Sequence, residues 1–124
     1  MIFAGGMIGA LTRWLLGLGV FWMEGAVDPL LATLAPNILG CLVIGLITGW
    51  SERRQLSPRH HAIPFGITGF CGAFTTFSSF ALESVALWPA PWVAAGYVAA
   101  TLLLCGAAVA LGQHLGLRPA GRRP

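Results

Sequence analysis

The uncharged run from residue 62 to 82 constrains the fold more than any other part of the chain. It is long enough to cross a bilayer, which takes roughly 20 residues per helix. Gly66, Gly69 and Gly72 recur at every third position, and hydroxyl residues crowd positions 75–79. Glycine loosens a helix, and Ser and Thr offer its backbone competing hydrogen bonds. Two interpretations stay open: a helix broken near the membrane centre, with bare carbonyls available to an ion, or a small-residue face for helix packing.

The composition places the chain among membrane proteins. Of its 124 residues 56% are hydrophobic and only 9% are charged, and none is lysine, so a small soluble fold is excluded. The net charge of +3 comes from arginine, most of it in two short segments. This pattern suits a position beside the membrane rather than a basic face for nucleic acid. The length corresponds to one domain.

Four apolar segments separated by short polar or Pro-rich turns predict four transmembrane helices. A signal peptide is the rival interpretation of the first segment, but the segment has no basic start and carries Arg13 in its middle. Because the connectors are short, the four helices are expected to form a compact antiparallel bundle. The sequence thus predicts an all-α membrane domain over residues 1–124, with helices at about 2–23, 30–50, 62–83 (broken near 72–76) and 92–112.

The three cysteines do not form a recognisable framework. Cys41, Cys71 and Cys105 are odd in number, each lies in an apolar run, and no CxxC or Cys/His spacing is present. Disulfides and zinc are therefore not expected. The sequence indicates that all three are small apolar fillers.

Ionisable residues, which are the first functional candidates inside a membrane, are sparse. Glu24, Asp28 and Glu52 fall in turns, Glu83 ends the third segment, and Arg13 alone lies well inside a span. Nothing resembles a catalytic dyad, triad or metal cluster, so the sequence argues against an enzyme. The lack of a carboxylate at mid-membrane also argues against a cation carrier.

What remains inside the membrane is a set of hydrogen-bond donors, which can replace the hydration shell of an anion. Phe77 and Phe80 are three residues apart on one helical face, and the electropositive edges of two such rings could flank an anion. Phenylalanines at this spacing also commonly pack a core, and the residues alone leave that alternative open. The donors are Arg13, Asn37, Thr75, Thr76, Ser78, Ser79, Tyr97 and Thr101.

At three places the sequence resembles the Fluc (CrcB-type) fluoride channels. Residues 72–83 (GAFTTFSSFALE) resemble the third-helix signature of that family, which is quite specific. Residues 5–14 and 37–41 resemble its first and second helices. The resemblance covers nearly the whole chain, in the right order and spacing.

The resemblance implies a passive channel that exports fluoride from the cytoplasm, with two pathways in a dual-topology dimer of antiparallel subunits. By it, Phe77 and Phe80 contact fluoride through their ring edges. The backbone carbonyls of Gly72 and Thr75, two from each subunit, hold a central structural Na⁺. Cys105 stands where the fourth helix would carry another hydroxyl. The remaining pathway positions that the resemblance implies are Arg13, Asn37, Ser78, Ser79, Tyr97 and Thr101.

The alternatives to a fluoride channel are a small four-helix multidrug or cation exporter and a non-transporting membrane assembly subunit. The first is disfavoured because no carboxylate lies at mid-helix, and the second would use the glycine faces only for packing. In each case the chain is expected to be a multi-pass protein of the inner (plasma) membrane. Its expected partners include the lipid bilayer but no nucleic acid.

Apart from Arg13 inside the first span, the arginines lie on one side of the predicted bundle. Four spans place both termini and the 51–61 connector on that side, and the other two turns carry no Lys or Arg. Positive loops favour the cytoplasm, so one fixed orientation is expected, with both termini inside. An antiparallel homodimer would instead need balanced loops. The expected partner is therefore either a second copy or an oppositely oriented paralogue. The six arginines are Arg53, Arg54, Arg59, Arg118, Arg122 and Arg123.

Overall fold

The chain is a bundle of long helices whose third member is built from three consecutive pieces. The structure, a computed structural model, describes the backbone of residues 1–24 and 29–118 and the side chains of residues 1–18 and 30–118. Within these residues there is no strand, so the all-α prediction is confirmed. The elements are α1 (Ile2–Glu24), α2 (Pro29–Arg53), η1 (Pro64–Cys71), α3 (Gly72–Phe74), α4 (Phe77–Ala86) and α5 (Pro91–Leu117).

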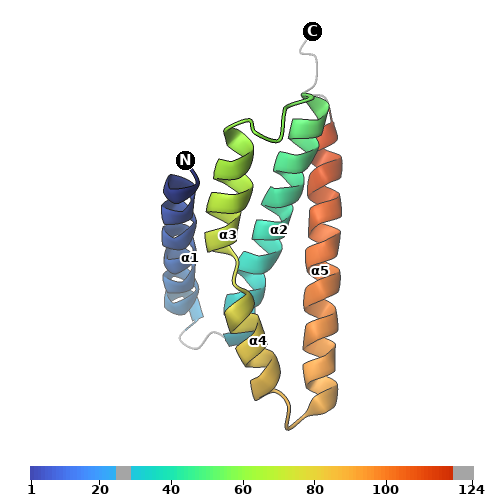
Figure 1. The fold of residues 1–124 in the computed structure, drawn as a ribbon. Coiled ribbons are helices and arrows are strands. Elements are labelled where there is room, and N and C mark those ends of the chain that lie inside the picture. Colours follow the sequence, from blue (N-terminus) through green and yellow to red (C-terminus); the bar gives the residue numbers. More distant parts are fainter. Residues whose placement is uncertain (25–28, 119–124) are drawn as a thin grey trace.

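Successive helices run in opposite directions, so α2 and α5 are parallel and lie side by side (Figure 1). The start of α1, the connector between α2 and η1, and the carboxyl end of α5 lie at one end of the bundle. The turn between α4 and α5 lies at the other end. The predicted acidic turn around Asp28 falls outside the described residues.

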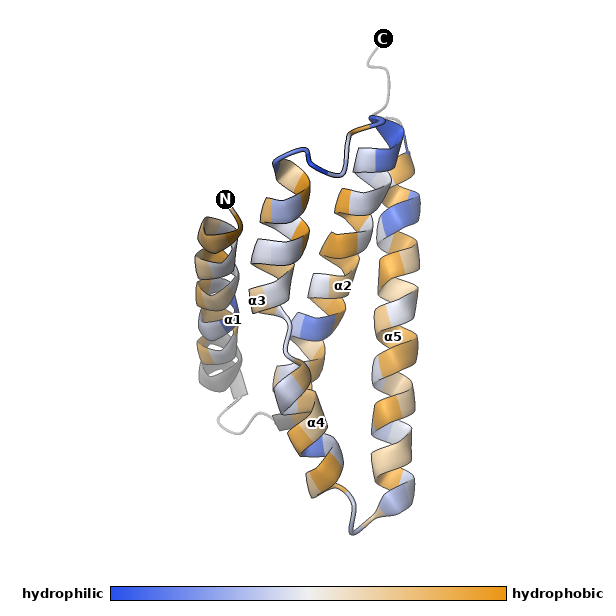
Figure 2. Cartoon of the chain, in the orientation of Figure 1, coloured by the Kyte–Doolittle hydropathy of each residue, from blue (hydrophilic) through white to orange (hydrophobic). Residues whose placement is uncertain are grey.

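Three helical stretches are long and apolar enough to cross a membrane: Leu30–Arg53, Pro64–Ala86 and Pro91–Leu117. The fourth apolar stretch, Ile2–Leu18, is the part of α1 whose side chains are described, and α1 itself runs to Glu24. Figure 2 shows apolar residues along the helices and the most hydrophilic residues near the connector between α2 and η1. The third span continues to Ala86, so Glu83 lies inside α4 and not at its end.

Helices α2 and α5 approach through glycine. A Cβ atom on Gly45 would lie 2.2 Å from the carbonyl oxygen of Val109, and one on Gly49 would lie 2.2 Å from that of Gln113. Both pairs are 64 residues apart in sequence, so the two helices keep one register over this turn. Only glycine fits at such distances. Gly45 and Gly49 therefore form a small-residue face that packs α2 against α5.

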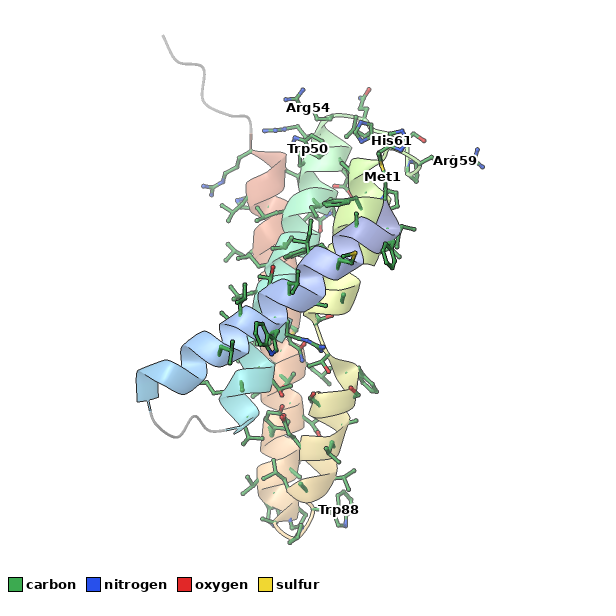
Figure 3. The ribbon with its side chains drawn as sticks, turned by 90° about the vertical axis from the view of Figure 1, so that its left-hand side faces the viewer. Met1, Trp50, Arg54, Arg59, His61 and Trp88 are labelled. Carbon is green, nitrogen blue, oxygen red and sulfur yellow. The ribbon has the colours of Figure 1, made fainter. Side chains whose placement is uncertain are left out.

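Helix α1 uses the same device against η1. A Cβ atom on Gly5 would lie 2.3 Å from the Phe65 carbonyl oxygen, and one on Gly9 would lie 2.2 Å from that of Phe70. The opposite face of α1 is apolar and exposed, as Phe3 shows with 80% of its surface accessible. Figure 3 shows α1 crossing the rest of the bundle obliquely.

The third segment is interrupted at two threonines. Gly72 is helical (φ −63°, ψ −29°), but Thr75 (φ −81°, ψ 161°) and Thr76 (φ −142°, ψ 117°) are extended. The interruption thus lies at the carboxyl end of the predicted 72–76 region. The glycines of this segment serve packing instead, since a Cβ atom on Gly69 would lie 2.5 Å from the carbonyl oxygen of Ile2. The run is therefore an interrupted helix at the threonines and a packing face at the glycines.

Candidate functional site

Asn37 holds the extended backbone at the interruption. Its side-chain amide donates from Nδ2 to the carbonyl oxygen of Thr76 at 3.1 Å, and its Oδ1 accepts from the Thr76 N–H at 2.8 Å. Both residues are buried. Because a buried backbone group without a partner is costly, Asn37 on α2 replaces the hydrogen bonds that the helix gives up at this point.

The side chain of Thr76 starts the next helix. Its Oγ1 accepts from the Ser79 N–H at 3.3 Å, which is the usual N-cap contact. The same oxygen lies 3.2 Å from the hydroxyls of both Ser78 and Ser79. A cluster of three hydroxyls therefore sits at the amino end of α4, where the helix dipole is positive.

Two backbone carbonyls lose their helical partners as a result. In a continuous helix the Gly72 carbonyl would accept from the Thr76 N–H, which instead donates to Asn37. The Thr75 carbonyl would accept from the Ser79 N–H, which instead donates to Thr76 Oγ1. Gly72 and Thr75, the two positions expected to hold Na⁺, are therefore among the residues whose carbonyl oxygens the interruption releases.

A first cavity, of about 230 Å³, opens between α2, the interruption, α4 and α5. Its lining combines rings with polar groups and includes neither Asp nor Glu. The ring centroids of Phe77 and Phe80 are 5.8 Å apart, and Phe80 lies 5.6 Å from Tyr97. Phe77 is 79% exposed. The residues that line this cavity are Asn37, Cys41, Ile44, Thr75, Thr76, Phe77, Phe80, Thr101, Leu102 and Cys105.

A second cavity, of about 530 Å³, lies between α1, α2 and the start of α4. It brings the guanidinium-bearing Arg13 to the same space as Ser78 and Ser79. Thr76 lines both cavities, so the interruption separates them. The two cavities therefore differ in character, one cationic and lined by hydroxyls and the other lined by rings, while Tyr97 and Gly72 line neither of them.

The polar residues of α5 are engaged within the chain. The Thr101 hydroxyl donates to the Tyr97 carbonyl oxygen at 2.8 Å, although Thr101 lines the first cavity. Tyr97 contacts Phe80 through its ring, but its hydroxyl donates to Glu83 and not into the cavity. The Thr75 hydroxyl likewise donates to the Cys71 carbonyl oxygen at 2.9 Å.

Glu83 is the residue that sequence reasoning missed. Its Oε1 accepts from the Thr33 hydroxyl at 2.5 Å, and its Oε2 accepts from the Tyr97 hydroxyl at 2.6 Å. One carboxylate therefore joins α2, α4 and α5. The signal was present in the sequence, because Glu83 follows Phe80 by three residues and so shares its helical face. The sequence-based boundary at residue 83, however, places Glu83 at the end of the third span and not inside the membrane.

Among residues 1–18 and 30–118, no three His, Cys, Asp or Glu side chains come together in a way that could hold a metal ion. A cation held by three or more such side chains therefore has no site among these residues, whereas backbone oxygens near the interruption remain possible ligands. These features define a class: a multi-pass protein of the inner membrane with one helix interrupted between two polar cavities.

Comparison with known proteins identifies the family. A family model described as "CrcB-like protein, Camphor Resistance (CrcB)" matches residues 1–113. The chain is 39% identical over 124 residues to the "Fluoride-specific ion channel FluC" of Roseobacter denitrificans, covering 93% of this chain and 96% of that protein. It is 39% identical to proteins of the same name from Paracoccus denitrificans (90% and 88% covered) and Agrobacterium fabrum (94% and 93%). The chain belongs to the CrcB family.

Proposed function

We propose that this chain is a passive, fluoride-selective channel that lets the membrane potential expel cytoplasmic fluoride. Its relatives bear the name fluoride-specific ion channel, and their family is one of channels rather than enzymes. The observation that carries the proposal is the pairing of two cavities across the interruption. One offers Arg13 with hydroxyls and the other offers phenylalanine rings, and among residues 1–18 and 30–118 no Asp or Glu lines either of them.

The chemistry of fluoride fits this arrangement. Fluoride is small, hard and strongly hydrated, so a pathway must return hydrogen bonds as water is removed. Arg13, Ser78 and Ser79 supply charge and donors in the second cavity. Phe77 and Phe80 follow on the far side of Thr76, where positive ring edges replace the last waters.

The hydroxyl donors nearest the rings already donate hydrogen bonds within the chain, and a fluoride pathway has to account for this. Thr101 and Tyr97 already donate within the chain, so a passing anion must compete for their protons. The Glu83 side chain accepts from both Thr33 and Tyr97. In the proposed pathway this carboxylate holds the hydroxyl of Tyr97 beside Phe80 and fixes the ring that contacts it.

We propose a structural Na⁺ at the centre of a dimer. Na⁺ is a hard cation that prefers oxygen ligands, and the Gly72 and Thr75 carbonyls are among those that the interruption releases. Gly72 is exposed, and an added Cβ atom there would meet nothing closer than 3.9 Å within the chain. This surface therefore has room for a second subunit, either another copy or an oppositely oriented paralogue.

Fluoride efflux from liposomes tests the proposal against its two rivals. Reconstituted protein should release fluoride, measured with a fluoride electrode, when potassium and valinomycin set the membrane potential. Chloride release under the same gradient should stay at the level of empty liposomes. An exporter of organic cations would instead leave fluoride inside and respond to a proton gradient. A subunit that only assembles would release neither ion.

A further inference from the structure

The first cavity contains a pair of thiols that the proposed channel function does not use. Cys41 comes from α2 and Cys105 from α5, and both line the cavity beside Phe80. Both side chains are free and half-buried. The sequence predicts that they are small apolar fillers, because each lies in an apolar run and no CxxC or Cys/His spacing is present.

The register of the two helices brings these cysteines face to face. Gly45 meets Val109, and Gly49 meets Gln113, each across 64 residues. Cys41 and Cys105 have the same separation and precede the first pair by four residues, about one helical turn. They therefore occupy the next level of the same contact, and their thiols lie within reach of one another.

The third cysteine is placed differently. Cys71 on η1 has no accessible surface and does not line the cavity. It serves as an internal control, because it has the same chemistry in the same protein without the facing partner.

We propose that Cys41 and Cys105 form a two-thiolate binding site for a soft divalent d¹⁰ cation, with Hg²⁺ as the probe, at the wall of the proposed pathway. Soft cations select thiolate ligands. Binding breaks two S–H bonds, forms two S–Hg bonds and releases two protons, with no change of oxidation state. The product, a bis-thiolate, carries no net charge.

Charge neutrality is what favours this ion class at this position. Leaving an uncompensated charge inside an apolar environment is expensive. A monovalent soft ion held by two thiolates would leave one negative charge, whereas a divalent ion leaves none. Zn²⁺ generally takes four ligands, and the described residues offer no group of three such side chains. Two-coordinate binding is therefore the mode that the site supports.

The test measures bound metal and does not depend on transport. Purified full-length protein in detergent is loaded with HgCl₂, washed with the monothiol glutathione, and analysed for mercury and free thiols per chain. The parent should retain one Hg²⁺ and lose two free thiols. Chelation by two linked groups should hold the ion roughly 100-fold more tightly than one thiol, which is why it survives the wash.

Three serine variants decide the assignment. Cys41→Ser and Cys105→Ser should each lose the retained ion, and Cys71→Ser should keep it. The proposal is wrong if either of the first two variants retains Hg²⁺ like the parent, if one thiol is lost per ion, or if Cys71→Ser releases the ion. Alanine versions of the same variants exclude an effect of the serine hydroxyl.

Fluoride efflux adds an independent readout. Hg²⁺ should block efflux through the parent and Cys71→Ser, and a small dithiol should restore it, whereas Cys41→Ser and Cys105→Ser should conduct in its presence. If the parent conducts no fluoride at all, the proposed function fails, but the bound-metal result still decides this site. If bound Hg²⁺ leaves efflux unchanged in a conducting parent, the placement of the site at the pathway wall is wrong.

Discussion

The side chain of Asn37 and the backbone of Thr76 exchange two hydrogen bonds, with Nδ2 donating to the carbonyl oxygen at 3.1 Å and the Thr76 N–H donating to Oδ1 at 2.8 Å. A single amide side chain on α2 thereby satisfies both backbone groups of an extended residue in the middle of a membrane helix. Both cavities open beside Thr76, and its side chain caps α4, so this contact holds the residue at which these features meet.

Asn37→Ala should therefore destabilise the protein and remove transport. It leaves two buried backbone groups without partners, at about 1–3 kcal/mol for each. Asn37→Asp keeps the acceptor for the Thr76 N–H but loses the amide donor. The stability of this variant should therefore fall between that of the parent and that of Asn37→Ala. Thermal unfolding in detergent and fluoride efflux measure the two effects. An alanine variant that unfolds at the parent's temperature would contradict this role.

Phe77→Ala and Phe80→Ile should each remove most fluoride efflux while leaving the protein folded. Phe77 is 79% exposed, so truncating it costs little packing within one chain. Phe3→Ala is the matched control, since Phe3 is 80% exposed but lies on α1. Efflux and size-exclusion chromatography are compared for all three variants. Normal fluoride efflux by both the Phe77→Ala and the Phe80→Ile variant would show that these rings only pack the protein and do not contact fluoride.

Gly72→Val should weaken dimer assembly rather than folding of the single chain. An added Cβ atom at Gly72 meets nothing closer than 3.9 Å inside the chain, but it covers the carbonyls that we assign to Na⁺. Gly106→Val is the control, because a Cβ atom there meets nothing within 4 Å on another helix.

The same assignment predicts a dependence on sodium. If only the assembled dimer binds the ion, each tenfold rise of sodium above its Kd stabilises the dimer by about 1.4 kcal/mol. Dimer dissociation is measured in sodium, potassium and a bulky organic cation at equal ionic strength. Equal dissociation in all three salts would exclude the sodium site.

Tyr97→Phe should destabilise the protein by about 1.5–3 kcal/mol, the usual worth of a hydrogen bond to a charged group. The Glu83 carboxylate accepts from Thr33 and Tyr97 together, so Thr33→Val and Tyr97→Phe should be non-additive in a double-mutant cycle. Ser84→Ala, which loses only a contact within its own helix, should change stability little. Additive effects measured by denaturation would show that the carboxylate does not couple α2 to α5.

The chain should insert with both termini in the cytoplasm when it is produced alone. Figure 3 shows Arg54 and Arg59 at the same end as Met1, and Trp88 at the opposite end. Positive loops stay inside. A cysteine introduced as Gly121→Cys, in a chain whose three native cysteines are changed to alanine, should resist a membrane-impermeant thiol reagent added to intact cells. Comparable labelling from both sides would show dual insertion and remove the need for a paralogue.

Part of the site could be predicted from local sequence. The Phe77 and Phe80 spacing, the hydroxyl-rich stretch and the glycine faces of α1 and α2 are patterns within a single helix, and the structure contains each of them. The hydrogen bond from Asn37 to Thr76 joins residues that are 39 apart in sequence, and the helical periodicity of the sequence does not predict such a contact. The local sequence pattern predicted the interruption to within the five residues 72–76. The structure shows that Thr75 and Thr76 leave the helix, whereas Gly72 stays helical.

The sequence by itself determined the membrane class, the all-α fold and the family motifs, because hydropathy and helical period depend only on neighbours along the chain. Only the tertiary structure decided which polar groups meet. It placed the Glu83 carboxylate between Thr33 and Tyr97, divided the pathway residues between two cavities, and brought Cys41 to Cys105. The physical reason is that the register of α2 against α5 is set by glycine contacts between backbones, and such contacts join residues that the linear sequence keeps far apart.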